Sequence, residues 1–416
     1  MPELPTFTPR AHRAFSAGFY ANADFDYDVR ILLGAAAFGC TELGEVLATI
    51  DSVASGDHEH WYHAWSDLGT RLHADADAAH EAGHIRTAAG RYLRAATYTS
   101  VAVNAASGLP NADDILLPTY QQHRASWERF VDTTPRPVER VQIPYEDTTL
   151  PGYFFQAAID GAPRPTLIMI NGSDGATSNH WSSGATDALD RGYNVLLFDG
   201  PGQQSMLFEH DTAFRPDWEN VLTPVIDHLI TRKDVDATAL VIYAISQGGY
   251  WAPRALAFEH RIAAAIIDPG VVDVAASWSS NIPGSLMKQF RAGKKEAFDR
   301  DMALGMKFSP ATARTWAFRA RPYRQGSYFD TLTEVHRYSL SAEVAAQITT
   351  PLFVTSPEHE QFWPGQSEAL AEMTGGPVDV SPFTAADGAD FHCQPLARQL
   401  THERMFDWLD HTLAAD

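Results

Sequence analysis

The chain contains 416 residues, of which 45% are hydrophobic, so it is long and apolar enough to bury a sizeable core. Its formal net charge of −21 argues against nucleic acid and against an anionic membrane surface as partners. The two cysteines, Cys40 and Cys393, make no disulfide framework, and the first residues lack the basic and apolar regions of a secretory signal. We therefore expect a cytoplasmic protein and leave a homodimer open.

The first third of the chain has the pattern of a helical domain. Over residues 86–105, alanine, leucine and tyrosine recur at roughly helical spacing, and similar patterns extend from 13 to about 131. The apolar run 31–40 is too short to span a bilayer and is typical of a buried helix. Pro135 then interrupts the helical pattern. We predict a helical N-terminal lid domain over residues 1–135.

After residue 136, short apolar runs alternate with helical stretches. The predicted strands cover residues 138–144, 150–156, 166–170, 194–198, 239–243, 263–267, 351–355 and 378–383. The later runs are continuously apolar, which is typical of parallel strands covered on both faces. This alternation predicts an α/β fold with a doubly wound, mostly parallel, eight-stranded sheet flanked by helices over residues 136–416.

The strand rhythm stops between about residues 271 and 348. This segment carries helical patterns and many aromatic residues. We expect a helical cap inserted over the carboxyl ends of the strands, where ligands bind in open α/β sheets.

A candidate nucleophile lies in the sequence AISQGG at residues 244–249, between an apolar strand and a helical run. On a tight turn from strand to helix, Ser246 would project its hydroxyl above the sheet, and small residues on both sides would relieve crowding. Ala244 replaces the first glycine of the common G-x-S-x-G pattern. Earlier in the chain, the loop NGSDG at residues 171–175 also follows a strand. Backbone N–H groups of Gln247 and of either Gly172 or Ser173 are candidates for an oxyanion hole.

The candidate acid and base follow later strands. The loop SPEHEQFWP at residues 356–364 offers Glu358 and Glu360 as the carboxylate that orients a histidine. We favour Glu360 because it lies four residues before Pro364, as the acid does in many hydrolases of this type. His392, in GADFHCQ after the last strand, completes the order serine, acid, histidine.

These motifs are similar to those of a known family. Residues 138–416 resemble an α/β-hydrolase. The helical segment YLRAATY, FDGPGQ at 198–203, EQFWPGQ at 360–366 and GADFHCQ at 388–394 resemble the group with a helical N-terminal lid. That group includes the fungal yellowish-green pigment polyketide-shortening hydrolases, the 2,6-dihydroxypseudooxynicotine hydrolase and the FrsA-like proteins. The resemblance implies Ser246, Glu360 and His392 as nucleophile, acid and base.

The resemblance also implies a carbonyl-containing small-molecule substrate that is cleaved through an acyl-enzyme. The bond would be a carbon–carbon bond of β-diketone type, or an ester, in an aromatic or polyketide-like metabolite. An acyltransferase or cyclase of secondary metabolism, and a non-catalytic binding protein on a hydrolase scaffold, are the alternative functions.

Candidate pocket residues are Asp199 and several aromatic side chains: Tyr20, Tyr250, Trp251, Trp278 and Trp363. We expect no metal, because neither His58, His60 and His63 nor His73, His80 and His84 form a recognisable ligand motif. We expect no cofactor either, since the GPG at residues 200–202 does not complete a dinucleotide fingerprint.

Overall fold

The computed structural model of the chain describes residues 18–414. The first 17 residues of the predicted N-terminal domain lie outside this range. Among the described helices, none combines the length and apolarity that a membrane crossing requires.

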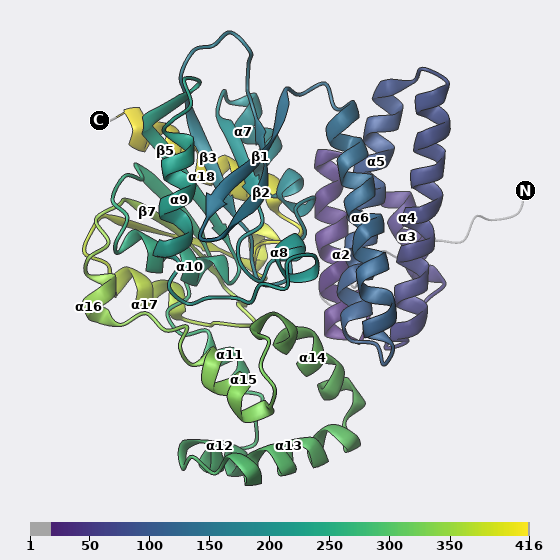
Figure 1. The fold of residues 1–416 in the computed structure, drawn as a ribbon, viewed down its shortest axis with the longest axis vertical. Coiled ribbons are helices and arrows are strands. Elements are labelled where there is room, and N and C mark those ends of the chain that lie inside the picture. Colours follow the sequence, from purple (N-terminus) through teal and green to yellow (C-terminus); the bar gives the residue numbers. More distant parts are fainter. Residues whose placement is uncertain (1–17, 415–416) are drawn as a thin grey trace, which may run out of the picture.

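The N-terminal region is a bundle of helices that stands beside the sheet (Figure 1). Its helices are α2 (Ala23–Ala35), α3 (Leu43–Asp51), α4 (His58–Glu81), α5 (Ile85–Ser107) and α6 (Ala112–Thr133). Helix α2 begins where the Asn22 side chain accepts a hydrogen bond from the backbone N–H of Phe25, which satisfies one unpaired donor of the first turn. The predicted helix at 31–40 ends earlier than expected, because the 3₁₀ turn η1 (Ala36–Phe38) follows α2 and Gly39 then adopts a left-handed conformation.

An eight-stranded sheet forms the centre of the molecule. Its strands are β1 (Val138–Tyr145), β2 (Thr148–Phe155), β3 (Arg164–Ile170), β4 (Asn194–Phe198), β5 (Val235–Ile245), β6 (Ala264–Asp268), β7 (Leu352–Pro357) and β8 (Val378–Phe383). Their order is β1-β2-β4-β3-β5-β6-β7-β8. The β1–β2 and β2–β4 pairs are antiparallel, and all other neighbours are parallel. All eight predicted strands are present, and the predicted fold class is confirmed.

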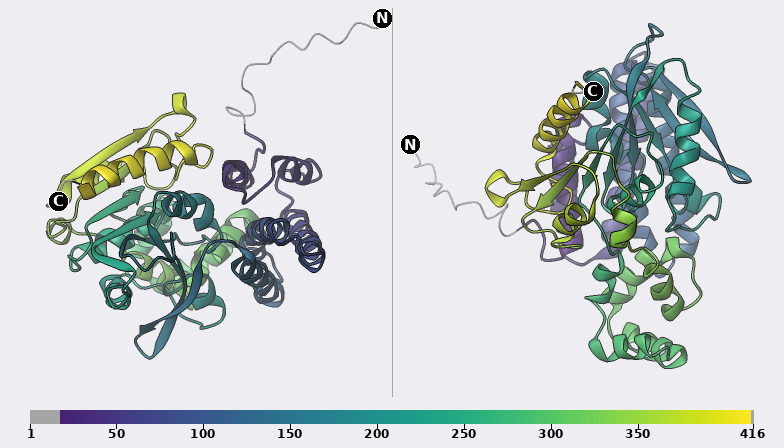
Figure 2. Two further views of the ribbon diagram at one scale, coloured as in Figure 1. Left: turned by 90° about the horizontal axis from the view of Figure 1, so that it is seen from above. Right: turned by 90° about the vertical axis from the view of Figure 1, so that its left-hand side faces the viewer.

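Helices cover both faces of the sheet, as the continuous apolar strands require. One face packs on α9 (Glu219–Leu229), α10 (Gly248–Leu256), α16 (Ala342–Ala345) and α17 (Gln366–Met373). The other face packs on α7 (Thr186–Asp190) and α18 (Arg398–Ala414), and Figure 2 shows α18 lying along that face. The π-helical turn η2 (Trp181–Ala185) precedes α7, so the helical stretch between β3 and β4 is not a regular α-helix throughout.

The N-terminal helices share a hydrophobic core with the sheet. Tyr92 of α5 and Trp127 and Phe130 of α6 belong to the same buried cluster as Phe155 of β2 and Trp181. Three of these rings meet closely, since the centroids of Phe130 and Trp181 are 4.9 Å apart and those of Phe155 and Trp181 are 5.1 Å apart. Buried aromatic contacts therefore hold the bundle against the flank of the sheet.

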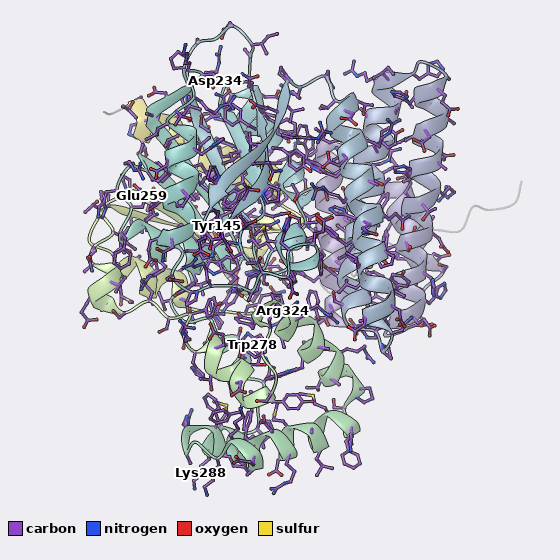
Figure 3. The ribbon with its side chains drawn as sticks, viewed as in Figure 1. Tyr145, Asp234, Glu259, Trp278, Lys288 and Arg324 are labelled. Carbon is purple, nitrogen blue, oxygen red and sulfur yellow. The ribbon has the colours of Figure 1, made fainter. Side chains whose placement is uncertain are left out.

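The segment between β6 and β7 consists of helices. They are α11 (Ala275–Ser279), α12 (Gly284–Arg291), α13 (Lys295–Phe308), α14 (Pro310–Ala320), α15 (Tyr328–Val335) and the short α16, with the 3₁₀ turn η3 (Arg321–Tyr323) after α14. An antiparallel bridge between Asp273 and Ser339 closes the base of this insertion. Trp278 lies where the insertion meets the core, whereas Lys288 lies at its outer end (Figure 3).

Candidate active site

Ser246 lies on a sharp turn between β5 and α10. Its φ of 55° is in the left-handed region, which a non-glycine residue adopts only under the constraint of its surroundings. The glycines after it permit that turn. A Cβ on Gly248 would approach the carbonyl oxygen of Ile170 to 3.0 Å, and one on Gly249 would lie 1.9 Å from the carbonyl oxygen of Pro269. Ala244 is accommodated because it belongs to β5 itself, where it pairs with Ile170 and Ile267.

The structure brings Ser246, His392 and Glu360 together. The Nε2 atom of His392 lies 2.9 Å from the Oγ atom of Ser246. Its Nδ1 atom lies 2.9 Å from both carboxylate oxygens of Glu360. The His392 and Glu360 side chains are 3% and 4% exposed, so they interact largely away from bulk water.

The loop after β7 and the loop after β8 are hydrogen-bonded to each other around this pair. The backbone N–H of His392 donates to Oε1 of Gln361, and the backbone N–H groups of Phe362 and Trp363 donate to Oε1 of Glu360. Glu358, the alternative acid, lies elsewhere: its Oε2 accepts from the backbone N–H of Ala385 at 2.8 Å. Glu360 is thus the glutamate of this loop that contacts His392.

The electrostatics of the pair favour opposite charges. Burial opposes the charged form of Glu360, but His392 and the two backbone N–H donors outweigh it and lower the pKa of this carboxyl. Burial likewise opposes protonation of His392, but its interactions with Cys393 and Glu360 outweigh this effect and raise the pKa of His392 well above 6.5. Burial raises the pKa of the Cys393 thiol, so this thiol is uncharged at neutral pH. Glu360 is therefore the group that carries negative charge beside His392.

Gly172 and Ser173 lie beside Ser246, but their backbone N–H groups differ. A Cβ on Gly172 would come within 2.7 Å of the Ser246 Cβ atom, so the loop after β3 lies directly against the serine. The Gly172 N–H already donates to Oδ1 of Asn171. Within residues 18–414, the N–H groups of Ser173 and Gln247 donate to no other residue, so these two are the donors open to a bound oxygen.

A cavity of about 320 Å³ opens above Ser246. Its walls come from α2, α4, α5, the loop after β3, and α11 and α14 of the insertion. Aromatic side chains dominate parts of the lining: Phe25, Tyr27, Trp61, Trp278, Phe318, Tyr323, Phe362 and Trp363. Both the N-terminal bundle and the insertion therefore face the serine, as expected of a roof over it.

Other pocket predictions need correction. Tyr250 and Trp251 are 1% and 0% exposed and belong to the core beneath the sheet, because the first turn of α10 directs them away from the cavity. The Tyr250 hydroxyl donates to the carbonyl of Pro216, and Trp251 stacks on Trp218.

Asp199 and Tyr20 are absent from the cavity lining too. Asp199 accepts hydrogen bonds from Thr177 and Ser205, so it pins the loop after β4. The hydroxyl of Tyr20 donates to the carbonyls of Ile50 and Val53 inside the N-terminal bundle.

The sequence reasoning missed the face of α2. Asp24, Tyr27, Asp28 and Ile31 line the cavity at i, i+3, i+4 and i+7, a spacing that marks one helix face and was readable in advance. The Tyr27 hydroxyl donates to the carbonyl of His392 at 2.8 Å. Burial, with the nearby Asp24 and Asp174, raises the pKa of Asp28 to about 8, so the neutral form of this carboxyl predominates at neutral pH.

No group of three or more His, Cys, Asp or Glu side chains in residues 18–414 is arranged to hold a metal ion. Neither histidine set of the N-terminal helices forms such a group within these residues. His58, a member of the first set, lines the cavity beside Phe25.

Comparison with known families agrees with this architecture. The model of the alpha/beta hydrolase family matches residues 167–406, more than half of the chain. The chain belongs to the alpha/beta hydrolase family. This α/β-hydrolase is similar along nearly its whole length to hydrolase LUC6 of a Fusarium species, with 28% identity over 96% of this chain and 98% of that protein. It is similarly related to the 20-hydroxy-prefusarin hydrolase FUS2 of Gibberella moniliformis, with 29% identity over 97% of this chain and 98% of that protein.

Solved structures share the fold. The 2,6-dihydroxy-pseudo-oxynicotine hydrolase superimposes with a TM-score of 0.71 and 19% identity, covering 92% of this α/β-hydrolase and 96% of that chain. AbyA5 superimposes with a TM-score of 0.60 and 18% identity, covering 95% and 99% of the two chains. The helical N-terminal region is therefore part of an architecture that other solved proteins share.

Proposed function

We propose that this chain is a serine hydrolase that cleaves a carbonyl-containing small molecule through an acyl-enzyme. The observation that supports it is the chain of hydrogen bonds from Ser246 Oγ through His392 to Glu360, with both distances at 2.9 Å. In this proposal Ser246 is the nucleophile, His392 the general base and Glu360 the acid that orients it.

The reaction begins when His392 takes the proton of Ser246 and the serine oxygen attacks the substrate carbonyl carbon. The Gln247 and Ser173 N–H groups stabilise the resulting oxyanion, an effect worth about 3 kcal/mol per donor in comparable sites. The tetrahedral intermediate then collapses, and the leaving group departs with the proton from His392. Water, activated by the same histidine, hydrolyses the acyl-enzyme and restores the free serine.

The scissile bond is proposed to be a carbon–carbon bond of β-diketone type or an ester bond in an aromatic or polyketide-like metabolite. The aromatic lining of the cavity supports a substrate with flat, apolar parts, since such rings contribute large contact areas. The name of FUS2, a 20-hydroxy-prefusarin hydrolase, supports a metabolite substrate, because this relative aligns over almost the entire chain.

A second candidate is acyl transfer or cyclisation. The helices that enclose the cavity on several sides favour it, because an enclosed site limits the access of water to an acyl-enzyme. A nucleophile within the bound substrate would then compete with water for the acyl group. Product analysis by mass spectrometry separates the two outcomes, since hydrolysis adds the mass of one water.

The test of the serine mechanism is labelling with a fluorophosphonate probe, followed by peptide mapping. We expect one modification, on Ser246, and none in Ser246→Ala. Ser205→Ala is a suitable control, because this buried serine bonds to Asp199 and does not contact His392. An unlabelled wild-type protein would exclude the serine mechanism and favour a binding protein on a hydrolase scaffold.

A further inference from the structure

Helix α14 of the insertion presents two arginines to the cavity above Ser246. Arg314, Phe318 and Arg319 all line this cavity, at positions i, i+4 and i+5 of the helix. The helix packs against the end of α5, where the Cβ atom of Arg314 lies 3.4 Å from the position that a Cβ on Gly108 would occupy. The two guanidinium groups are therefore carried by a helix packed against the N-terminal bundle.

Neither guanidinium has an acidic partner. Within residues 18–414, Arg314 and Arg319 form no ion pair and donate no hydrogen bond, and the Nε atom of Arg314 is buried without a partner. Arg321 also lines the cavity, and its Nε atom is likewise buried without a partner, but its Nη1 atom pairs with Asp113. Arg324 pairs with Asp211. Both Arg314 and Arg319 are half-buried. A guanidinium partly withdrawn from water without a counter-ion is unfavourable, so two such residues that face a cavity point to an anionic ligand.

Arg319 lies near the reacting groups. Its guanidinium carbon is 5.0 Å from the centre of the Phe362 ring, and that ring is 4.8 Å from the imidazole ring of His392. The positive charge is thus separated from the proposed base by one aromatic ring. Arg314 lies more than one turn before Arg319 in α14, near His58 of α4. Burial lowers the pKa of His58 most, and the positive charge of Arg314 lowers it further.

The acidic residues of the cavity do not neutralise these charges. Asp24, Asp28 and Asp174 belong to α2 and to the loop after β3, and Asp24 and Asp174 act on the carboxyl of Asp28 with no opposing arginine. Carboxylates and arginines share the cavity, since Asp24 and Arg314 both act on His58 and Asp174 and Arg319 both act on Tyr323. Helix α14 supplies the two positive charges that remain without an ion-pair partner among the described residues.

We propose that Arg319, assisted by Arg314, binds a carboxylate of the substrate and gives this hydrolase a preference for anionic substrates. The planar fork of a guanidinium matches the two oxygens of a carboxylate and fixes its orientation. The contacts through Phe362 put that carboxylate in the same cavity as Ser246, on the side of His392 where Phe362 lies. This inference rests on the proposed function only for the position of the reacting carbon.

Binding to the Ser246→Ala protein tests the proposal without requiring turnover. The probes are 4,6-dioxoheptanoate, a β-diketone with one carboxylate, and its uncharged methyl ester, each titrated by calorimetry. We expect the acid to bind at least about tenfold more tightly than the ester, as expected of a charge-assisted contact. Adding Arg319→Gln should remove this preference, Arg319→Lys should retain part of it, and Arg314→Gln should reduce it less. Equal binding of acid and ester, or no binding of the acid, would overturn the proposal.

A control separates recognition from structural effects. Arg300→Gln changes an exposed arginine of α13 in the same insertion, and it should leave the preference unchanged. If Arg319 only stabilised the insertion through Phe362, its replacement would weaken acid and ester equally, and this result also contradicts the proposal. Should Arg319→Gln fail to fold, Arg319→Met and Arg314→Gln provide the same comparison.

Hydrolysis of mono-p-nitrophenyl glutarate and p-nitrophenyl butyrate distinguishes this proposal from the proposed function. If both esters resist hydrolysis while the binding preference persists, the serine mechanism fails and the carboxylate site stands. If both are hydrolysed with the same loss of kcat/KM in Arg319→Gln, the carboxylate site fails and the serine mechanism stands.

Discussion

The hydroxyl of Tyr27 donates a hydrogen bond to the backbone carbonyl of His392 across 365 positions of sequence, at 2.8 Å. This contact joins α2 of the N-terminal bundle to the loop that carries the proposed base. The bundle therefore does more than cover the cavity, since it holds one side of the His392 loop in position.

Replacing Tyr27 with phenylalanine should lower kcat/KM by roughly fivefold, the effect of losing a hydrogen bond worth about 1 kcal/mol. The ring remains, so the thermal midpoint should change little. Tyr62→Phe is the matched control, because its hydroxyl bonds to Thr119 within the bundle and is remote from His392. Equal kinetic effects of the two variants would show that the Tyr27 contact does not position the base.

Glu360→Gln should reduce kcat by up to about 10⁴-fold, the loss seen when a triad carboxylate becomes an amide and the histidine tautomer is no longer fixed. Glu358→Gln should change kcat little, because its partner is the backbone N–H of Ala385. Steady-state kinetics of both variants provides the measurement. A larger loss for Glu358→Gln would remove Glu360 from the mechanism.

The pH dependence should reveal the charge of Glu360. Only neutral His392 accepts the serine proton, and its pKa is raised above 6.5, so kcat/KM should increase as the pH rises through a value above 6.5. Glu360→Gln removes the negative charge that favours the imidazolium, so the acidic limb of the profile should move to lower pH. Rates of fluorophosphonate labelling between about pH 5 and pH 9 give both profiles. An unchanged acidic limb in the variant would contradict this origin of the shift.

Gly172→Ala should lower kcat by at least about 100-fold, because its methyl group would displace Ser246 or the neighbouring oxyanion donors. The new Cβ atom would lie 2.7 Å from that of Ser246 and 3.2 Å from its hydroxyl oxygen. Gly44→Ala serves as control, since a Cβ there meets no atom within 4 Å. Wild-type kinetics in Gly172→Ala would mean that this loop lies farther from the serine during catalysis.

Local patterns in the sequence determined the sheet and the order of the candidate triad. The apolar run 194–198 has the same bounds as β4, because buried parallel strands admit few polar residues. The predicted strand 378–383 has the same bounds as β8, although this edge strand contains Asp379 and Ser381 and buries only Phe383. The glycines after Ser246 likewise revealed the turn, since only small residues fit against the ends of the neighbouring strands.

Tertiary packing decided what local patterns leave open. Glu358 and Glu360 have the same chemistry in one loop, and only the path of that loop past His392 determines which of them contacts it. Tyr250 and Trp251 are suitable pocket residues by composition, yet the direction of α10 buries them in the core. The cavity itself joins α2, α14 and the sheet from distant parts of the sequence. Such contacts depend on how whole elements pack, and no short segment of sequence contains that information.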